Sequence, residues 1–134
     1  MTLESALSVA QGAVPECVAV GYVDMSTGML LGVRTVDSHP QEVLDLVAAA
    51  TADLFQGQNV TGIEKMFRNS RGVAEDGDHY FNEILVFSEN LLHVFLRSSK
   101  ASDQAVIFVC RASANVGMAL TKSRQALGSI ENAA

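Results

Sequence analysis

The chain is short of charged residues and has no long hydrophobic run. Asp, Glu, Lys and Arg make up only 18% of its 134 residues, against about 25% in ordinary soluble domains. Apolar residues make up 49%, so the composition excludes an intrinsically disordered chain. The longest apolar stretches, 17–23 and 105–110, are far shorter than the roughly 18 residues of a membrane-spanning helix. We therefore expect a single folded domain over 1–134, with some apolar surface left for a partner.

Basic residues are few and scattered. Nine Lys and Arg stand against fifteen Asp and Glu, which gives a net charge of −6 and a pI near 4.9. Without a basic cluster, neither nucleic acid nor an anionic membrane is an expected partner. The phosphate-binding patterns G-x-x-x-x-G-K-[ST] and G-x-G-x-x-G after a strand are missing as well. We expect no cofactor.

The two cysteines, Cys17 and Cys110, lie inside apolar runs. No basic segment followed by an apolar one, as in a secretory signal, precedes them. The sequence therefore predicts a cytoplasmic protein with two buried, reduced thiols. A disulfide stays possible if their strands are neighbours.

Hydrophobic periodicity and turn residues predict the order α-β-β-α-(α)-β-β-β-α. The predicted elements are a helix from Thr2 to Gly12, strands 17–25 and 29–36, a helix 40–56, a short helix within 59–70, strands 80–88, 91–98 and 105–110, and a helix from Ser113 to Gly128. This order predicts an α+β fold with a mainly antiparallel five-stranded sheet between helices. Strand 17–25 is nearly all apolar and strand 105–110 is continuously so; the two therefore belong at the centre and the other three toward the edges. We expect the tail 129–134 to be disordered.

The predicted helix 40–56 is apolar around half of its circumference or more, which is wider than the stripe of an ordinary surface helix. Its polar side is limited to Gln41, Glu42, Asp45 and Asp53. Such a helix needs two packing partners. One is its own sheet, and the second is either the remaining core or another subunit.

The densest polar cluster is 75–79, which ends in His79. Its carboxylates could bind a divalent cation, yet the spacing fits neither a calcium loop nor a zinc site. A solvated acidic loop is the better interpretation. His93 sits among apolar residues of a predicted strand, and there is no G-x-S-x-G nucleophile motif. We expect no enzyme activity and no metal site.

Three groups of residues resemble the roadblock / dynein light chain family. Asp24 and Gly28 match its hairpin turn, the run 48–50 with Leu54 matches its Ala-rich second helix, and the run 115–120, with Asn115 and Gly117, matches the start of its last helix. We expect Gly117 to allow close packing of that helix on the sheet. The stretch 59–78 departs from the family, because it is longer and more irregular than the usual connection.

The resemblance implies a profilin-like fold and homodimers built by the second helix and the strand after it, so that two sheets join edge to edge. The implied interface residues here are Leu46, Ala49, Asp53, Tyr80, Asn82 and Ile84. Family members are non-catalytic modules, and in bacteria they are often partners or regulators of small Ras-like GTPases. We therefore expect a bacterial, dimeric interaction module with a possible GTPase partner.

A small-molecule sensor is the alternative function. His93, Arg97 and Arg111 could line a polar pocket for a ligand. In the competing interpretation, which we favour, both arginines sit at strand ends and face water.

Overall fold

The computed structural model describes residues 2–36, 41–71 and 81–134, and the element order within them is the predicted one. The elements are α1 (Leu3–Ala13), β1 (Cys17–Asp24), β2 (Met29–Thr35), α2 (Gln41–Gln56), α3 (Gln58–Arg71), β3 (Glu83–Phe87), β4 (Leu91–Arg97), β5 (Gln104–Arg111) and α4 (Val116–Ala133). None of the helices within these residues is long and apolar enough to span a membrane.

The five strands form one sheet in the order β2-β1-β5-β4-β3, and every neighbouring pair is antiparallel. The α+β fold and the inner positions of β1 and β5 are as predicted. The expectation that the strand 91–98 lies toward an edge is wrong, because β4 is an inner strand. Both of its faces are covered, with Val94 in the core on one side and Phe95 in the core on the other.

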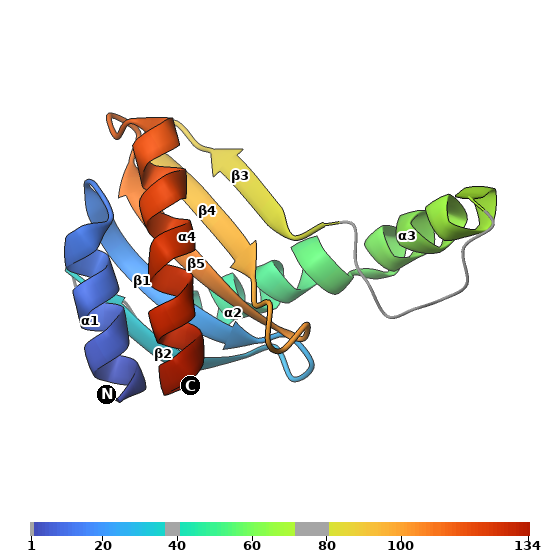
Figure 1. Ribbon diagram of the computed structural model, residues 1–134, viewed down its shortest axis with the longest axis horizontal. Coiled ribbons are helices and arrows are strands. Elements are labelled where there is room, and N and C mark those ends of the chain that lie inside the picture. The colour runs from blue at the N-terminus through green and yellow to red at the C-terminus, as the bar shows by residue number, and fades with distance from the viewer. Residues whose placement is uncertain (1, 37–40, 72–80) are drawn as a thin grey trace.

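Helices cover both faces of the sheet, as Figure 1 shows. α1 and α4 lie side by side on one face, and the core beneath them contains Leu7, Tyr22, Phe108 and Ile130. α2 crosses the other face and buries Phe55 there with residues of β1, β4 and β5. α3 continues from the end of α2 and extends past β3, away from the sheet (Figure 1).

The ends of α4 differ from the prediction. The N-cap is Asn115 rather than Ser113, since the Asn115 Oδ1 accepts a hydrogen bond from the Met118 N–H at 2.9 Å. The helix also passes through Gly128 and ends at Ala133, so the predicted disordered tail is wrong. A glycine inside a helix costs about 1 kcal/mol. Burying Ile130, which is fully inaccessible, recovers about 1.5–3 kcal/mol.

Two glycines occupy positions where a larger residue would not fit the fold, one in a tight turn and one beneath a helix. Gly28 ends the β1–β2 turn at a φ of +72°, and in that turn the Asp24 Oδ1 accepts hydrogen bonds from the Ser26 N–H and hydroxyl. Gly117 does not permit close packing on the sheet as expected, because a Cβ there would meet only the Asn115 Oδ1, at 3.5 Å. The glycine that lets a helix pack closely on the sheet is Gly32, where a Cβ would lie 3.0 Å from side-chain carbons of α1.

The connection between α2 and β3 also differs from the prediction. The short helix expected within 59–70 is a 14-residue helix, α3. The strand expected over 80–88 is only five residues long, as β3. The acidic cluster 75–79 and Tyr80 lie outside the described residues.

The two cysteines are free and buried, and they face each other across β1 and β5. The hydrogen bond with Cys17, together with burial, raises the pKa of Cys110. That thiol therefore stays protonated and acts as a small core residue.

Candidate interaction surface

The outer edge of β3 has free backbone groups. The Arg97 N–H donates to the Asn82 carbonyl at 2.7 Å, and the Ser88 N–H donates to the Leu91 carbonyl at 2.9 Å. Hydrogen-bonded pairs alternate along an antiparallel ladder, so even-numbered residues of β3 bond to β4. The N–H and C=O groups of Glu83, Leu85 and Phe87 therefore point outward, where they can pair with another strand.

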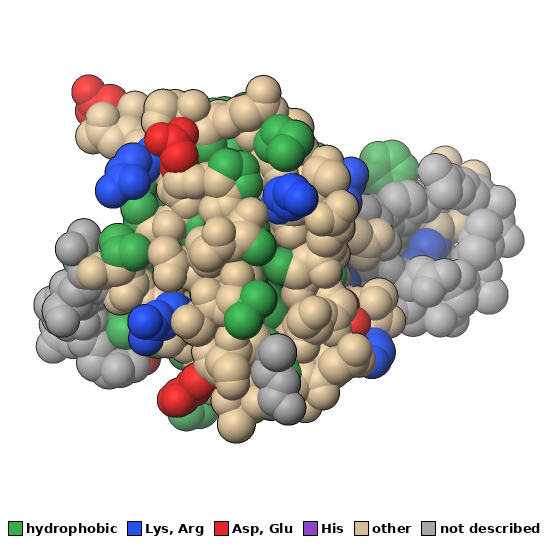
Figure 2. All heavy atoms as spheres, turned by 60° about the vertical axis from the view of Figure 1, so that its left-hand side comes forward, with side chains coloured by type: hydrophobic (Ala, Val, Ile, Leu, Met, Phe, Trp, Pro, Cys, Tyr) green, Lys and Arg blue, Asp and Glu red, His purple; other side chains and the backbone are tan. Residues whose placement is uncertain are grey.

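Both edge strands have exposed apolar side chains, such as Met29 and Leu31 on β2 and three residues of β3. Leu85 and Val86 are each 38% exposed and Phe87 is 61% exposed. The other edge strand, β2, has both α1 and α2 packed against it, whereas the main neighbour of β3 is β4. On the α1 side, Figure 2 shows hydrophobic side chains scattered between polar and charged ones, without one continuous patch. The β3 edge is therefore the better candidate for an interface.

The polar and apolar sides of α2 are placed largely as the sequence predicted. Ala48 and Phe55 are fully buried against the sheet, while Leu46 is 70% exposed and Ala49 and Asp53 are exposed. Of the remaining expected interface residues, Asn82 is exposed just before β3, and Ile84 is half-buried beside the α2 core. The exposed set thus includes one large apolar side chain on α2 and the start of the β3 edge.

Arg97 contradicts the expectation that it faces water, because only 6% of it is exposed. Its guanidinium donates to the carbonyls of Phe81 at 3.1 Å, Ser102 at 2.6 Å and Phe55 at 3.1 Å. It also lies over the Phe55 ring, 4.9 Å from the centroid. Burial lowers the pKa of Arg97, and the charge of Glu64 on α3 opposes this shift. Arg97 therefore joins the end of α2 to the start of β3.

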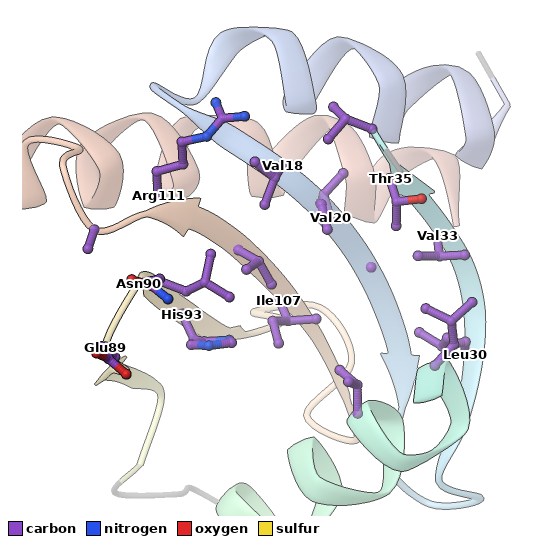
Figure 3. A pocket seen from close by; sticks show the side chains of 18 of the residues that line it. Val18, Val20, Leu30, Val33, Thr35, Glu89, Asn90, His93, Ile107 and Arg111 are labelled. Atoms are coloured by element: carbon purple, nitrogen blue, oxygen red, sulfur yellow. The ribbon is translucent and has the colours of Figure 1, made fainter. Parts of the chain in front are cut away.

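A groove of about 700 Å³ lies on the α2 face of the sheet, beside α2. Val18, Val33 and Ile107 are among its apolar lining residues, as Figure 3 shows, and Glu89 and Asn90 line its far end. Two of the three residues expected in a ligand pocket, His93 and Arg111, line it, whereas Arg97 does not. Burial lowers the pKa of His93. The imidazole is therefore neutral at pH 7.

The groove could not be predicted from the strand sequences, because its apolar strand residues have the same pattern as residues that are fully covered in a core. α2 covers the part of the sheet that holds Val23, Phe95 and Ala105. The available signal is width, because one helix about 10 Å across covers only about two strands spaced about 4.8 Å apart. Within the described residues there is no group of three or more His, Cys, Asp or Glu that could hold a metal ion.

The element order, the antiparallel sheet and the placement of helices define the Roadblock/LC7 fold. This chain has that fold, and the family resemblance drawn from Asp24, Ala48 and Asn115 is confirmed at that level. No protein-family model matches the chain, and no curated protein matches it by sequence.

Solved structures with this fold match nearly the whole chain at low sequence identity. A Roadblock/LC7 domain from Streptomyces avermitilis matches with a TM-score of 0.66 and 14% identity, over 98% of this chain and 97% of that one. MglB from Myxococcus xanthus matches with a TM-score of 0.71 and 12% identity, over 97% and 92%. A structure of MglB in a tetrameric arrangement matches with a TM-score of 0.68 and 14% identity, over 97% and 88%.

Proposed function

We propose that this protein is a non-catalytic module that forms homodimers through the β3 edge and the exposed side of α2, and that a small Ras-like GTPase is its partner. The observation that carries the proposal is the β3 edge, which combines outward backbone groups with three exposed apolar side chains. An edge of this kind is a template for pairing with another strand. The resemblance to roadblock proteins supports both the dimer and the GTPase partner, and the tetrameric arrangement of one MglB structure with this fold supports self-association.

The dimer is tested by removing one outward N–H. Leu85→Pro deletes a donor that points away from β4, and proline is tolerated on an edge strand when its nitrogen faces solvent. We expect a folded chain that sediments as a monomer. Leu85→Ala is the matched control, because it removes even more of the side chain but keeps the N–H, and it should remain largely dimeric. A wild-type chain that sediments as a monomer at tens of micromolar refutes the proposal.

The GTPase partner is tested with purified small Ras-like GTPases encoded in the same genome, starting with any encoded next to this chain. Titration calorimetry with the GTP- and GDP-loaded forms should detect binding to at least one of them. Absence of binding to every one in both forms refutes this part of the proposal.

The groove beside α2 favours a second candidate, a small-molecule sensor, because an apolar floor with His93 and Arg111 fits an amphipathic anion. Native mass spectrometry of the purified protein checks this reading. A retained small molecule supports a sensor, and a mass equal to that of the chain alone opposes it.

A further inference from the structure

The helix α3 presents apolar side chains to solvent. Ile63, Met66 and Phe67 are spaced i, i+3 and i+4, so they share one face of the helix. Their exposed fractions are 41%, 71% and 49%. A different face of α3 turns inward, since Glu64 is only 1% exposed. The three apolar side chains, called here the α3 stripe, are therefore exposed in the single chain.

The groove beside α2 lies beyond the reach of the α3 stripe of its own chain. α3 starts two residues after α2 ends and extends outward past β3 (Figure 1). The groove lies over β1, β2, β5 and the start of β4, with Leu44 and Val47 of α2 forming one wall. Each chain thus has an exposed apolar helix and an open apolar groove that cannot meet each other within the chain.

A second copy paired through β3 brings the two together. Arg97 fixes the junction of α2 and α3 at the level where β3 begins, through its hydrogen bonds to Phe55 and Phe81. In an antiparallel pair of β3 strands, the beginning of one lies beside the end of the other. The end of β3 leads directly to Glu89 and Asn90, which line the groove. The α3 of one copy therefore arrives at the groove of the other, and on the same face of the joined sheet.

Charge favours the same contact. Among its described side chains, α3 has the basic Lys65 and Arg68 and the acidic Glu64, whereas α2, which walls the groove, has the acidic Asp45 and Asp53 and none that is basic. The groove end adds Glu89, and Arg111 in the same lining carries the opposite charge, so the acidic surplus beside the groove comes from α2. Opposite charges on the arriving helix and on the receiving wall orient the contact.

We propose that α3 is an exchanged arm, and that in the dimer its stripe fills the groove beside α2 of the other copy. This inference rests on the proposed β3-paired dimer. It assigns a role to the segment that departs from the roadblock pattern. It also makes the groove an intersubunit site, filled by two symmetric contacts for each dimer.

The first test measures the dimer dissociation constant by analytical ultracentrifugation. Met66→Glu places a carboxylate in an apolar groove twice per dimer, so we expect the dimer dissociation constant to rise about 100-fold or more. Because Met66 is exposed in the single chain, the melting curve of the separated chain should not change. Thr61→Glu is the matched control, since Thr61 is exposed and five positions away, about 140° around the helix. It should leave the dissociation constant unchanged.

The outcomes separate this inference from the proposed function. If the wild type is a dimer, Leu85→Pro is a monomer and Met66→Glu is as tight a dimer as the wild type, the exchanged arm is refuted and the β3-paired dimer stands. If the wild type is a monomer, both are refuted. If Met66→Glu abolishes GTPase binding but leaves the dimer intact, the stripe binds the other protein and the inference is refuted.

The second test locates the contact directly. A photo-crosslinking phenylalanine analogue replaces Met66, and the protein is mixed with a ¹⁵N-labelled wild-type chain. We expect crosslinks to peptides of β1, β2, β5, the end of β3 or the start of β4 in the labelled chain. Crosslinks confined to the same chain, or directed to the α1 and α4 face, overturn the inference. A small molecule retained by the dimer, with crosslinks elsewhere, does so as well.

Discussion

Replacing Arg97 with methionine tests whether one buried cation joins three parts of the fold. Met has a similar length and keeps the apolar contact with Phe55. It cannot donate to the carbonyls of Phe55, Phe81 and Ser102, which receive hydrogen bonds from the arginine. The substitution therefore removes these three bonds and the charge that faces the buried Glu64, while most of the packing stays.

The size of the effect follows from how buried each acceptor is. The bond to the Phe55 carbonyl is buried and the other two are partly buried. A hydrogen bond from a charged donor contributes about 1.5–3 kcal/mol, and a buried acceptor without a partner costs about 1–3 kcal/mol. Water can reach the two partly buried carbonyls, so losing their hydrogen bonds costs less free energy. We expect a total destabilisation of about 3–5 kcal/mol, out of the 5–15 kcal/mol typical of a domain.

Urea unfolding followed by circular dichroism measures this loss. With a slope of about 2 kcal/mol per molar urea, the midpoint should fall by about 2 M while the slope stays constant. Arg111→Met is the matched control, because Arg111 is exposed at the end of β5. It should change stability by less than about 0.5 kcal/mol. If the two variants unfold at midpoints within error of each other, Arg97 does not hold these elements together.

Three further predictions concern other parts of the fold. Asn115→Ala removes the N-cap of α4 and should cost about 1 kcal/mol, whereas Asn115→Asp should cost far less; equal losses in urea unfolding would contradict the capping role. Gly32→Val places carbon atoms against Leu3 and Leu7, which already lie 3.0 Å from an added Cβ. It should lower the melting temperature by several degrees through overpacking of about 1–3 kcal/mol, and an unchanged melting temperature would refute this close contact. Burial lowers the pKa of His93, so the folded state binds this proton less readily than the unfolded state does. Above the His93 pKa of the unfolded state, stability is unaffected. It is lost as the pH falls through the His93 pKa of the folded state. The unfolding free energy should therefore fall from pH 7 to pH 5 more steeply in the wild type than in His93→Gln, and parallel curves would exclude a contribution from His93.

The sequence predicted the element order because each strand and helix carries its own periodicity and its own turn residues. β1 and β5 were placed at the centre for a physical reason, since strands that are almost entirely apolar need cover on both faces. β4 was misplaced because its alternation of His93 and Arg97 with apolar residues looks half-exposed. In the structure Arg97 is buried because its guanidinium donates hydrogen bonds to backbone carbonyls of three separate segments. The sequence around Arg97 does not reveal these acceptors, since they lie elsewhere in the chain.

Helix ends and contact surfaces were harder to predict for the same reason. Gly128 is a stop signal by its own propensity, and only the burial of Ile130, a tertiary contact, carries α4 past it. The glycine at a close helix–sheet contact is Gly32 and not Gly117, because this contact depends on how α1 crosses β2. The exposure of Leu46 followed from the wide apolar arc of α2. The groove did not, since it results from the part of the sheet that α2 leaves uncovered.

The pairing of α1 with α4 has a practical consequence for handling the protein. Leu3 at the start of α1 and Ala133 at the end of α4 both pack on the same core cluster, and the two chain ends lie close together in Figure 1. Affinity tags or fluorescent fusions attached at either end would project from the α1 and α4 side. Immobilisation through such a tag therefore leaves the β3 edge and the groove facing the solution, which suits surface-based binding measurements with a captured chain.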